Sequence, residues 1–90
     1  PISKNFDLKQ NYPNPFNPAT TIPFTLKQSA QVTLEVFDIM GRKVETLMNE
    51  NMLPGEYKVT WNAGGKATGT YLYILKVDNK VESKKMMFVK

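Results

Sequence analysis

Three prolines fall within six residues near the start of this 90-residue chain. They belong to residues 11–18, which read Asn-Tyr-Pro-Asn-Pro-Phe-Asn-Pro and are called the proline segment below. Proline lacks a backbone N–H and pushes the preceding residue toward extended geometry, which excludes a helix. Asparagine side chains also favour Asx turns by bonding to nearby backbone. We therefore expect a rigid, extended segment that forms a structural lid, with its aromatic residues, Tyr12 and Phe16, buried against a β domain. The alternative is that the segment is itself a recognition element.

Beyond the proline segment, apolar and polar residues alternate in short runs, which is typical of strands that bury one face. Gly41 suits a turn position with positive φ. Pro23 cannot donate a hydrogen bond to a sheet, so the strand that contains it should lie at an edge or begin at the proline. Residues 49–54 are predicted to form a loop. The predicted strands are residues 6–9, 21–26, 32–37, 43–48, 56–61, 70–77 and 81–89. About seven short strands without a convincing helix predict an all-β fold, an antiparallel β-sandwich.

The inward-facing positions of these runs define a candidate core. Trp61 shares its strand face with Tyr57 and Val59, which favours core packing over an exposed aromatic platform for sugars. The predicted core residues are Ile22, Phe24, Leu26, Val32, Leu34, Val36, Val44, Leu47, Tyr57, Val59, Trp61, Tyr71, Tyr73, Leu75 and Met86.

The composition argues against catalysis and against metal binding. The chain has no cysteine and no histidine, so it lacks thiolate nucleophiles and the commonest general base and metal ligand. Its three aspartates, Asp7, Asp38 and Asp78, lack the alternating spacing of a calcium loop. No carboxylate pair suited to hydrolysis stands out among Glu35, Glu45, Glu50, Glu56 and Glu82. We therefore expect no enzyme, no metal and no cofactor.

The basic charge favours a solvated surface over a nucleic-acid site. The formal net charge is +4, but the lysines are spread along the chain, as surface lysines usually are. No apolar run reaches the roughly 18 residues that a membrane-spanning helix needs. We expect neither a nucleic-acid partner nor a membrane span.

Five blocks of the sequence, in order, resemble the type A C-terminal sorting domain of the type IX secretion system. That family is similar to the immunoglobulin-like domain of the flagellar hook-capping protein. The blocks are residues 11–22, 32–44, 53–61, 69–73 and 84–90. The signature residues within the first four are Asn11, Tyr12, Pro13, Asn14, Pro15, Phe16, Asn17, Pro18, Gly41, Arg42, Gly55, Trp61, Gly69 and Tyr71. The chain departs from the family at Pro23 and in the loop at residues 63–66.

The resemblance implies an immunoglobulin-like sandwich that acts as a delivery signal for a parent protein of Bacteroidota. It implies passage through the periplasm to the cell surface or the medium. The implied partners are the outer-membrane type IX translocon, its shuttle proteins and a sortase-like cysteine protease. In this family the protease commonly removes the domain and attaches the parent protein to lipopolysaccharide at the cell surface. The implied recognition residues, called the terminal block below, are Lys84, Lys85, Met86, Met87, Phe88, Val89 and Lys90.

Two other readings of the sequence stay open. A β-sandwich of this size also suits a carbohydrate-binding module of an extracellular enzyme or adhesin. It equally suits a structural spacer or self-assembling cap, because a terminal strand at a sheet edge offers backbone groups for strand addition or self-association. Residues 1–5 read as a linker from the parent protein and residues 6–90 as the sorting domain, which puts the expected cleavage site at or before residues 1–5.

Overall fold

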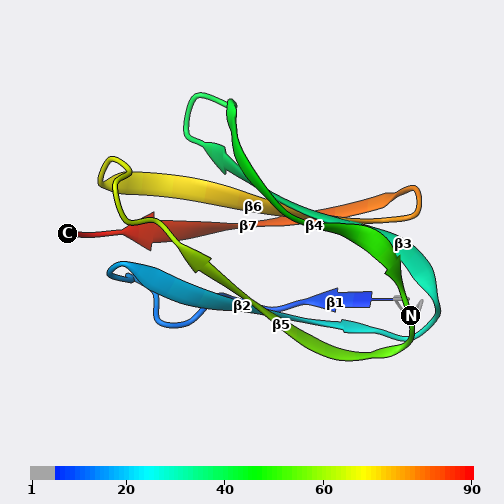
Figure 1. The fold of residues 1–90 in the computed structure, drawn as a ribbon. Coiled ribbons are helices and arrows are strands. Elements are labelled where there is room, and N and C mark those ends of the chain that lie inside the picture. The colour runs from blue at the N-terminus through cyan, green and yellow to red at the C-terminus, as the bar shows by residue number, and fades with distance from the viewer. Residues whose placement is uncertain (1–5) are drawn as a thin grey trace.

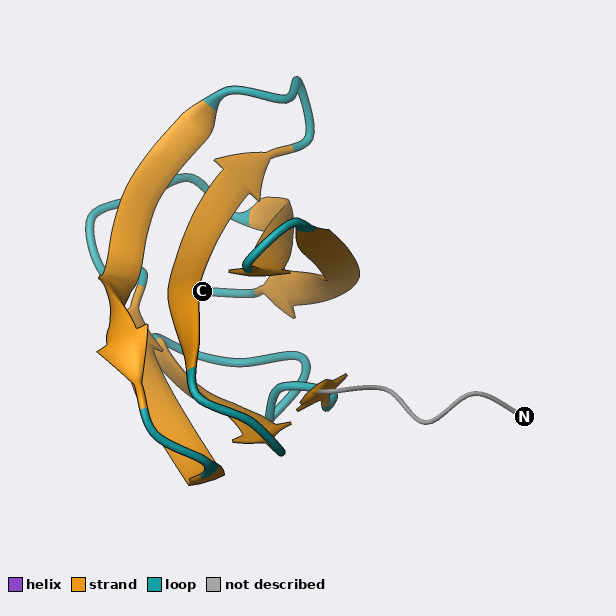
Figure 2. Ribbon diagram, turned by 90° about the vertical axis from the view of Figure 1, so that its right-hand side faces the viewer, coloured by secondary structure: helices purple, strands orange, loops and turns teal. Residues whose placement is uncertain are grey.

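The computed structural model describes residues 6–90, which form seven strands and no helix (Figure 2). No helix in this part of the chain is therefore long and apolar enough to cross a bilayer. The linker predicted at residues 1–5 lies outside the described residues. The strands are β1 (Phe6–Leu8), β2 (Ala19–Leu26), β3 (Ala30–Asp38), β4 (Lys43–Met52), β5 (Gly55–Asn62), β6 (Gly69–Val77) and β7 (Lys80–Phe88).

The strands form two antiparallel sheets that pack as a sandwich (Figure 1). A three-stranded sheet has the order β1-β2-β5, and a four-stranded sheet has the order β4-β3-β6-β7. The chain crosses between the sheets at each of the β2–β3, β4–β5 and β5–β6 connections. This arrangement is an immunoglobulin-like β-sandwich, so the predicted fold class is confirmed.

The core lies between the inner faces of the sheets. The alternation predicted for β2 and β3 is confirmed, because Ile22, Phe24, Val32 and Leu34 are fully or almost fully buried. Four predicted core residues are only partly buried against this cluster, namely Val44, Leu47, Tyr57 and Val59. The buried hydrophobic residues that the core prediction did not include are Phe6, Leu8, Phe16, Met52, Ala63, Val77 and Phe88.

Strand β4 is longer than the sequence predicts. It runs to Met52 and pairs with β3 as far as Ala30, so most of the loop expected at residues 49–54 is strand. The prediction was wrong because β4 is an edge strand that exposes Asn49, Glu50 and Asn51, and polar residues on an edge strand resemble a loop. Glycine at position 41 has a φ of 84° in the turn before β4, as predicted.

Both alternatives predicted for the strand that carries Pro23 were also wrong, because β2 begins at Ala19 and does not lie at an edge. Strand β2 is the middle strand of its sheet, between β1 and β5. The Pro23 carbonyl accepts a hydrogen bond from the Lys9 nitrogen at 3.0 Å, but proline has no N–H to return to Lys9. The Lys9 carbonyl instead accepts a hydrogen bond from the Tyr73 hydroxyl of the opposite sheet at 2.8 Å. A side chain from the core thus replaces the missing sheet bond.

Candidate recognition site

The terminal block lies almost entirely in β7, the edge strand of the four-stranded sheet. Strand side chains alternate between faces, so Met86 and Phe88 are buried in the core, whereas Lys85 and Met87 are exposed. Lys84 is partly exposed, and Val89 and Lys90 are exposed beyond the strand. The predicted recognition residues therefore divide into two core anchors and five side chains that solvent reaches.

The proline segment covers the outer edge of β7 over the terminal block. The Phe16 nitrogen donates to the Met87 carbonyl at 2.9 Å, and the Val89 nitrogen donates to the Phe16 carbonyl at 3.0 Å, which forms a short parallel bridge. The Met87 nitrogen donates to Asn14 Oδ1 at 2.9 Å. Gln10, just before the segment, donates from Nε2 to the Lys85 carbonyl at 2.8 Å. This half of the edge is therefore closed to strand addition.

Among the described residues, none pairs with the backbone of the other half of the β7 edge. Backbone groups of an antiparallel strand alternate sides, so Val81 and Ser83 face outward like Met87 and Val89. Within residues 6–90, no hydrogen bond reaches the backbone N–H or C=O groups of Val81 and Ser83 on that side. The Val81 side chain is exposed as well. The backbone that a partner strand can pair with thus lies before the terminal block, at residues 81–83.

The two aromatic residues of the proline segment lie in different environments. Phe16 is buried, as predicted, with its ring centroid 5.4 Å from that of Phe88 and 5.8 Å from that of Trp61. Tyr12 is 47% exposed, so its predicted burial was wrong. Its backbone pairs with Thr21, and this pairing directs the side chain away from the core. The segment therefore docks through one ring.

Tyr73 joins the proline segment to the opposite sheet through its hydroxyl. The residue is fully buried, and its oxygen accepts a hydrogen bond from the Asn11 nitrogen at 2.8 Å while it donates to the Lys9 carbonyl. Burial raises the pKa of Tyr73 to about 12, against a smaller lowering from the Asn11 hydrogen bond. The phenol thus stays protonated at every physiological pH and can donate and accept at once.

The Asn11 side chain is buried and completes this polar cluster. Its Nδ2 donates to Thr20 Oγ1 at 2.9 Å and to the Pro13 carbonyl at 3.3 Å. The Thr20 hydroxyl donates to the same Pro13 carbonyl at 2.9 Å. A buried polar side chain must find such partners to avoid a desolvation cost. The first signature residue is therefore structural, and it fixes the start of the proline segment on β2.

The remaining signature residues of the proline segment are exposed at the surface. Pro13, Pro15, Asn17 and Pro18 are exposed, and the Pro18 carbonyl accepts a hydrogen bond from the Ala63 nitrogen at 2.8 Å. Asn14 is exposed too, but its side chain bonds to β7 and not to its own turn. The peptide bonds before Pro13, Pro15 and Pro18 are cis.

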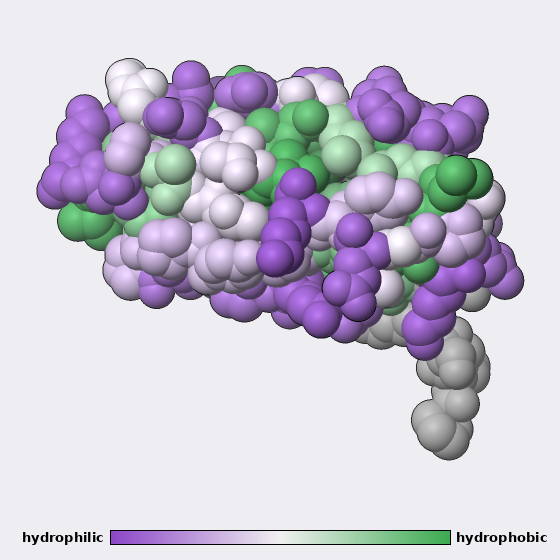
Figure 3. All heavy atoms as spheres, turned by 60° about the horizontal axis from the view of Figure 1, so that its bottom comes forward, coloured by the Kyte–Doolittle hydropathy of each residue, from purple (hydrophilic) through white to green (hydrophobic). Residues whose placement is uncertain are grey.

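The aromatic residues considered as a sugar platform are all in the core. Trp61, Tyr71 and Tyr73 are buried, and the indole of Trp61 meets the ring of Tyr71 edge-on at 5.4 Å. The Trp61 Nε1 donates to Glu45 Oε1 at 3.0 Å. The preference for core packing is therefore confirmed. The face of the molecule shown in Figure 3 is mainly hydrophilic, with small and separate apolar patches.

Glu35 is buried on the outer side of β3 and is held by two lysines. The Lys43 ammonium lies 3.2 Å from Oε2 and the Lys76 ammonium 3.3 Å from Oε1. Burial alone would raise the pKa of Glu35, but the hydrogen bonds and charges of the two lysines outweigh it and lower the pKa. The carboxylate thus serves as an ionic link between β3, β4 and β6.

The other acidic side chains that bond within the described chain stabilise turns and edges. Asp38 and Asp78 accept backbone hydrogen bonds from Arg42 and Gln31, respectively, and Glu82 Oε1 accepts one from the Leu8 nitrogen at 3.2 Å. Across residues 6–90 there is no group of three or more acidic, histidine or cysteine residues placed to hold a metal ion. The site therefore consists of one edge strand and the segment that covers half of it.

A small sandwich whose edge strand is only partly covered can be recognised by strand pairing and by its exposed side chains. A family model described as "Secretion system C-terminal sorting domain" matches residues 10–90. The chain belongs to this family, whose members are noncatalytic signal modules of type IX secretion. Membership implies interaction with the secretion machinery and a destination outside the cell or on its surface.

A solved structure has the same fold. The crystal structure of dimeric latent PorU from Porphyromonas gingivalis matches with a TM-score of 0.72 and 23% sequence identity. The match covers 93% of this chain and 9% of that chain, so this domain corresponds to a small part of a much larger protein. No curated protein matches the sequence.

Proposed function

We propose that the exposed part of the terminal block, together with the open backbone at residues 81–83, is the surface that the type IX machinery reads. The observation that carries this proposal is the position of β7. It is the last strand, it lies at a sheet edge, and it presents Lys85 and Met87 outward. Because the proline segment occupies the backbone edge from Lys85 onward, a partner reads this part of β7 by its side chains.

The folded domain is the signal in this proposal. Met86 and Phe88 are core residues, so the terminal block has its outward geometry only when the sandwich is folded. The parent protein passes through the periplasm, where shuttle proteins and the outer-membrane translocon bind the folded domain. A sortase-like cysteine protease then cuts in or before the linker predicted at residues 1–5. The domain is the substrate of this cleavage.

Lysines on β7 supply charge for this recognition. Lys80, Lys84 and Lys85 lie on the strand, and Glu82, its one acidic residue, turns its carboxylate to the Leu8 nitrogen. An excess of positive charge at an open edge favours a partner with an acidic surface and speeds their encounter.

The test is export of a reporter fused to this chain in a host that has the type IX machinery. Complete removal of the terminal block is a poor test because it also removes Met86 and Phe88 from the core. A double variant, Lys85→Glu with Met87→Ser, changes only exposed side chains. Its matched control is Lys58→Glu with Leu53→Ser, which changes an exposed lysine of β5 and an exposed apolar residue of the turn before it.

The proposal requires export of the unaltered fusion and of the control, with the β7 variant held in the periplasm. Equal export of the β7 variant and the control would show that these side chains are not read. Failure of the unaltered fusion to leave the periplasm would contradict the secretion role of this chain.

A further inference from the structure

The turn between β3 and β4, residues 38–42, displays two large apolar side chains to solvent. Ile39 is 72% exposed and Met40 is 74% exposed. The turn projects beyond the body of the sandwich at the top of Figure 1. Adjacent apolar side chains at a projecting tip contribute little to the core, and exposed apolar surface in such a place is typical of interaction sites.

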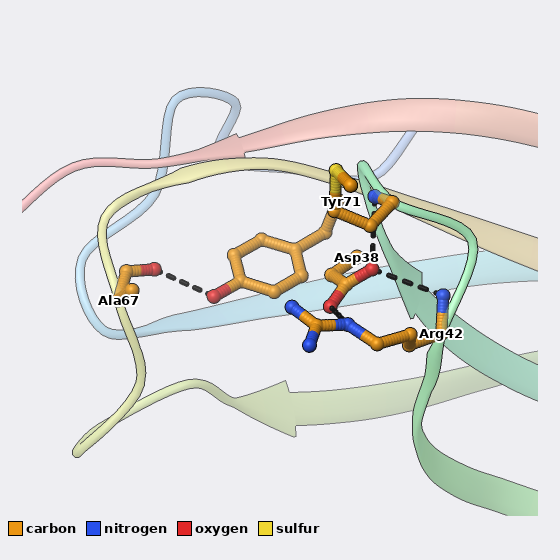
Figure 4. A network of polar contacts seen from close by, with 5 residues as sticks. Asp38, Arg42, Ala67 and Tyr71 are labelled. Carbon is orange, nitrogen blue, oxygen red and sulfur yellow. Dashed lines mark hydrogen bonds and ion pairs between the residues drawn. The ribbon is translucent and has the colours of Figure 1, made fainter.

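The turn is held in one conformation by the carboxylate of Asp38. Oδ1 accepts hydrogen bonds from the Met40 nitrogen at 2.9 Å and the Arg42 nitrogen at 3.0 Å, and Oδ2 accepts one from Arg42 Nε at 2.9 Å (Figure 4). The backbone hydrogen bond from Arg42 is the main cause of a lowered pKa of Asp38, so the carboxylate is charged at neutral pH. A turn fixed in this way loses little conformational entropy when it binds.

Arg42 keeps donors available beside the apolar tip. Its side chain is 78% exposed, and within residues 6–90 only Nε of the guanidinium has a hydrogen-bond partner. The two terminal amino groups can therefore bind a carboxylate of another molecule.

A shallow cavity of about 220 Å³ lies between this turn and residues 67–71. The far wall of the cavity is fixed as well, because the Tyr71 hydroxyl donates to the Ala67 carbonyl at 2.6 Å (Figure 4). The tip thus combines a rigid apolar projection, a guanidinium with two unused amino groups and a shallow recess.

We propose that the 38–42 turn is a second docking surface, and that a protein of the secretion machinery binds it. An apolar pocket of that protein takes Ile39 and Met40, and a carboxylate at the rim of the pocket pairs with Arg42. The inference rests on the proposed secretion function and adds a contact that the terminal block does not make.

A protein pocket fits this tip better than a lipid surface does. Asp38 and Arg42 neutralise each other, and the next cation, Lys43, is paired with Glu35. Anionic membranes are bound by clusters of about four to eight Lys or Arg residues, which the tip lacks. The turn has a fixed shape, and the planar guanidinium of Arg42 directs its two unused amino groups. Both features suit a protein pocket of defined geometry.

The test uses the reporter fusion with Ile39→Ser and Met40→Ser together, and separately with Arg42→Gln. The matched control is Leu53→Ser, because Leu53 is 71% exposed in the turn at the other end of β4. The urea midpoint of the purified chain is measured for each variant to show that it folds. Cosedimentation with vesicles of phosphatidylethanolamine and phosphatidylglycerol tests the lipid alternative.

We expect export to fall about tenfold in the Ile39/Met40 variant, as for the loss of an interface anchor, with a smaller fall for Arg42→Gln and none for Leu53→Ser. Export of both tip variants at the level of the unaltered fusion overturns this inference and leaves the proposed function standing. Vesicle binding that the Ile39/Met40 variant loses also overturns it, in favour of lipid. An unaltered fusion that stays in the periplasm overturns the proposed function and this inference with it.

Discussion

The rings of Phe16 and Phe88 stack with their centroids 5.4 Å apart and their planes inclined by 24°. One ring comes from the proline segment and the other from the last residue of β7. In addition to the stack, the backbone N–H of Phe16 donates to Met87 and its carbonyl accepts from Val89. Sequences at the two ends of the domain are therefore one structural unit, and a change in either end alters the other.

This stack predicts energetic coupling between the two ends. Phe16→Leu and Phe88→Leu should each destabilise the fold, and the double variant should lose less than the sum by about 0.5–1.5 kcal/mol, the range for aromatic pairs. Urea unfolding of the four proteins measures the coupling. Phe16→Leu combined with Phe6→Leu is the control, since Phe6 pairs with Leu26 at the far end of β2. That pair should be additive within about 0.5 kcal/mol.

Removal of the Tyr73 hydroxyl should be more costly than removal of an exposed hydroxyl. Tyr73→Phe leaves the Lys9 carbonyl and the Asn11 nitrogen without their buried partner, which should lower the free energy of unfolding by about 1–3 kcal/mol. Tyr57→Phe removes an exposed hydrogen bond to the Leu53 carbonyl and should have a smaller effect. Equal losses in urea unfolding would contradict the role of Tyr73 as the bridge.

The same hydroxyl predicts a loss of stability at alkaline pH. Folding raises the pKa of Tyr73 from 10.0 to about 12, so the unfolded chain releases this proton first and stability falls as the pH rises from about 10 to about 12. The fall should be shallower in Tyr73→Phe. Urea midpoints at several pH values measure it, and parallel curves for the two proteins would contradict the assignment.

Glu35 predicts a loss of stability at acidic pH. Its pKa is lowered from 4.5 in the folded state, so its contribution is present above pH 4.5 and is lost as the pH falls through the folded-state value. Glu35→Gln should reduce stability at neutral pH and flatten the acid dependence. Glu56→Gln, at an exposed position of β5, is the control and should lower the unfolding midpoint at neutral pH less than Glu35→Gln does.

The sequence alone was sufficient for the fold class and for most of the inner-face residues. Strands such as β3 alternate cleanly, and alternation reports burial on one face directly. It was insufficient where an edge strand carries polar residues, as in β4, and where a missing donor is replaced across the core, as at Pro23 and Tyr73. A hydrogen bond that is supplied from the opposite sheet leaves no local pattern in the sequence.

The candidate site was only partly predictable for the same reason. The sequence predicted that the last strand could lie at a sheet edge. It also predicted that Phe16, as an aromatic residue of the proline segment, is buried against the sandwich. The pairing of Phe16 and Asn14 with Met87 joins residues far apart in the sequence, and a single sequence carries no local sign of it. The sequence predicted that Asn14 would bond to nearby backbone in an Asx turn, whereas its side chain accepts a hydrogen bond from Met87 in β7.

The proline segment closes the terminal half of the β7 edge, and among residues 6–90 nothing pairs with the backbone of the other half. Amide hydrogen exchange along β7, followed by NMR on the purified domain, tests this arrangement most directly. We predict slow exchange at Met87 and Val89, fast exchange at Val81 and Ser83, and selective acceleration at Met87 in Asn14→Ala. Exchange at Met87 and Val89 as fast as at Val81 and Ser83 would contradict it, because the whole edge would then be open.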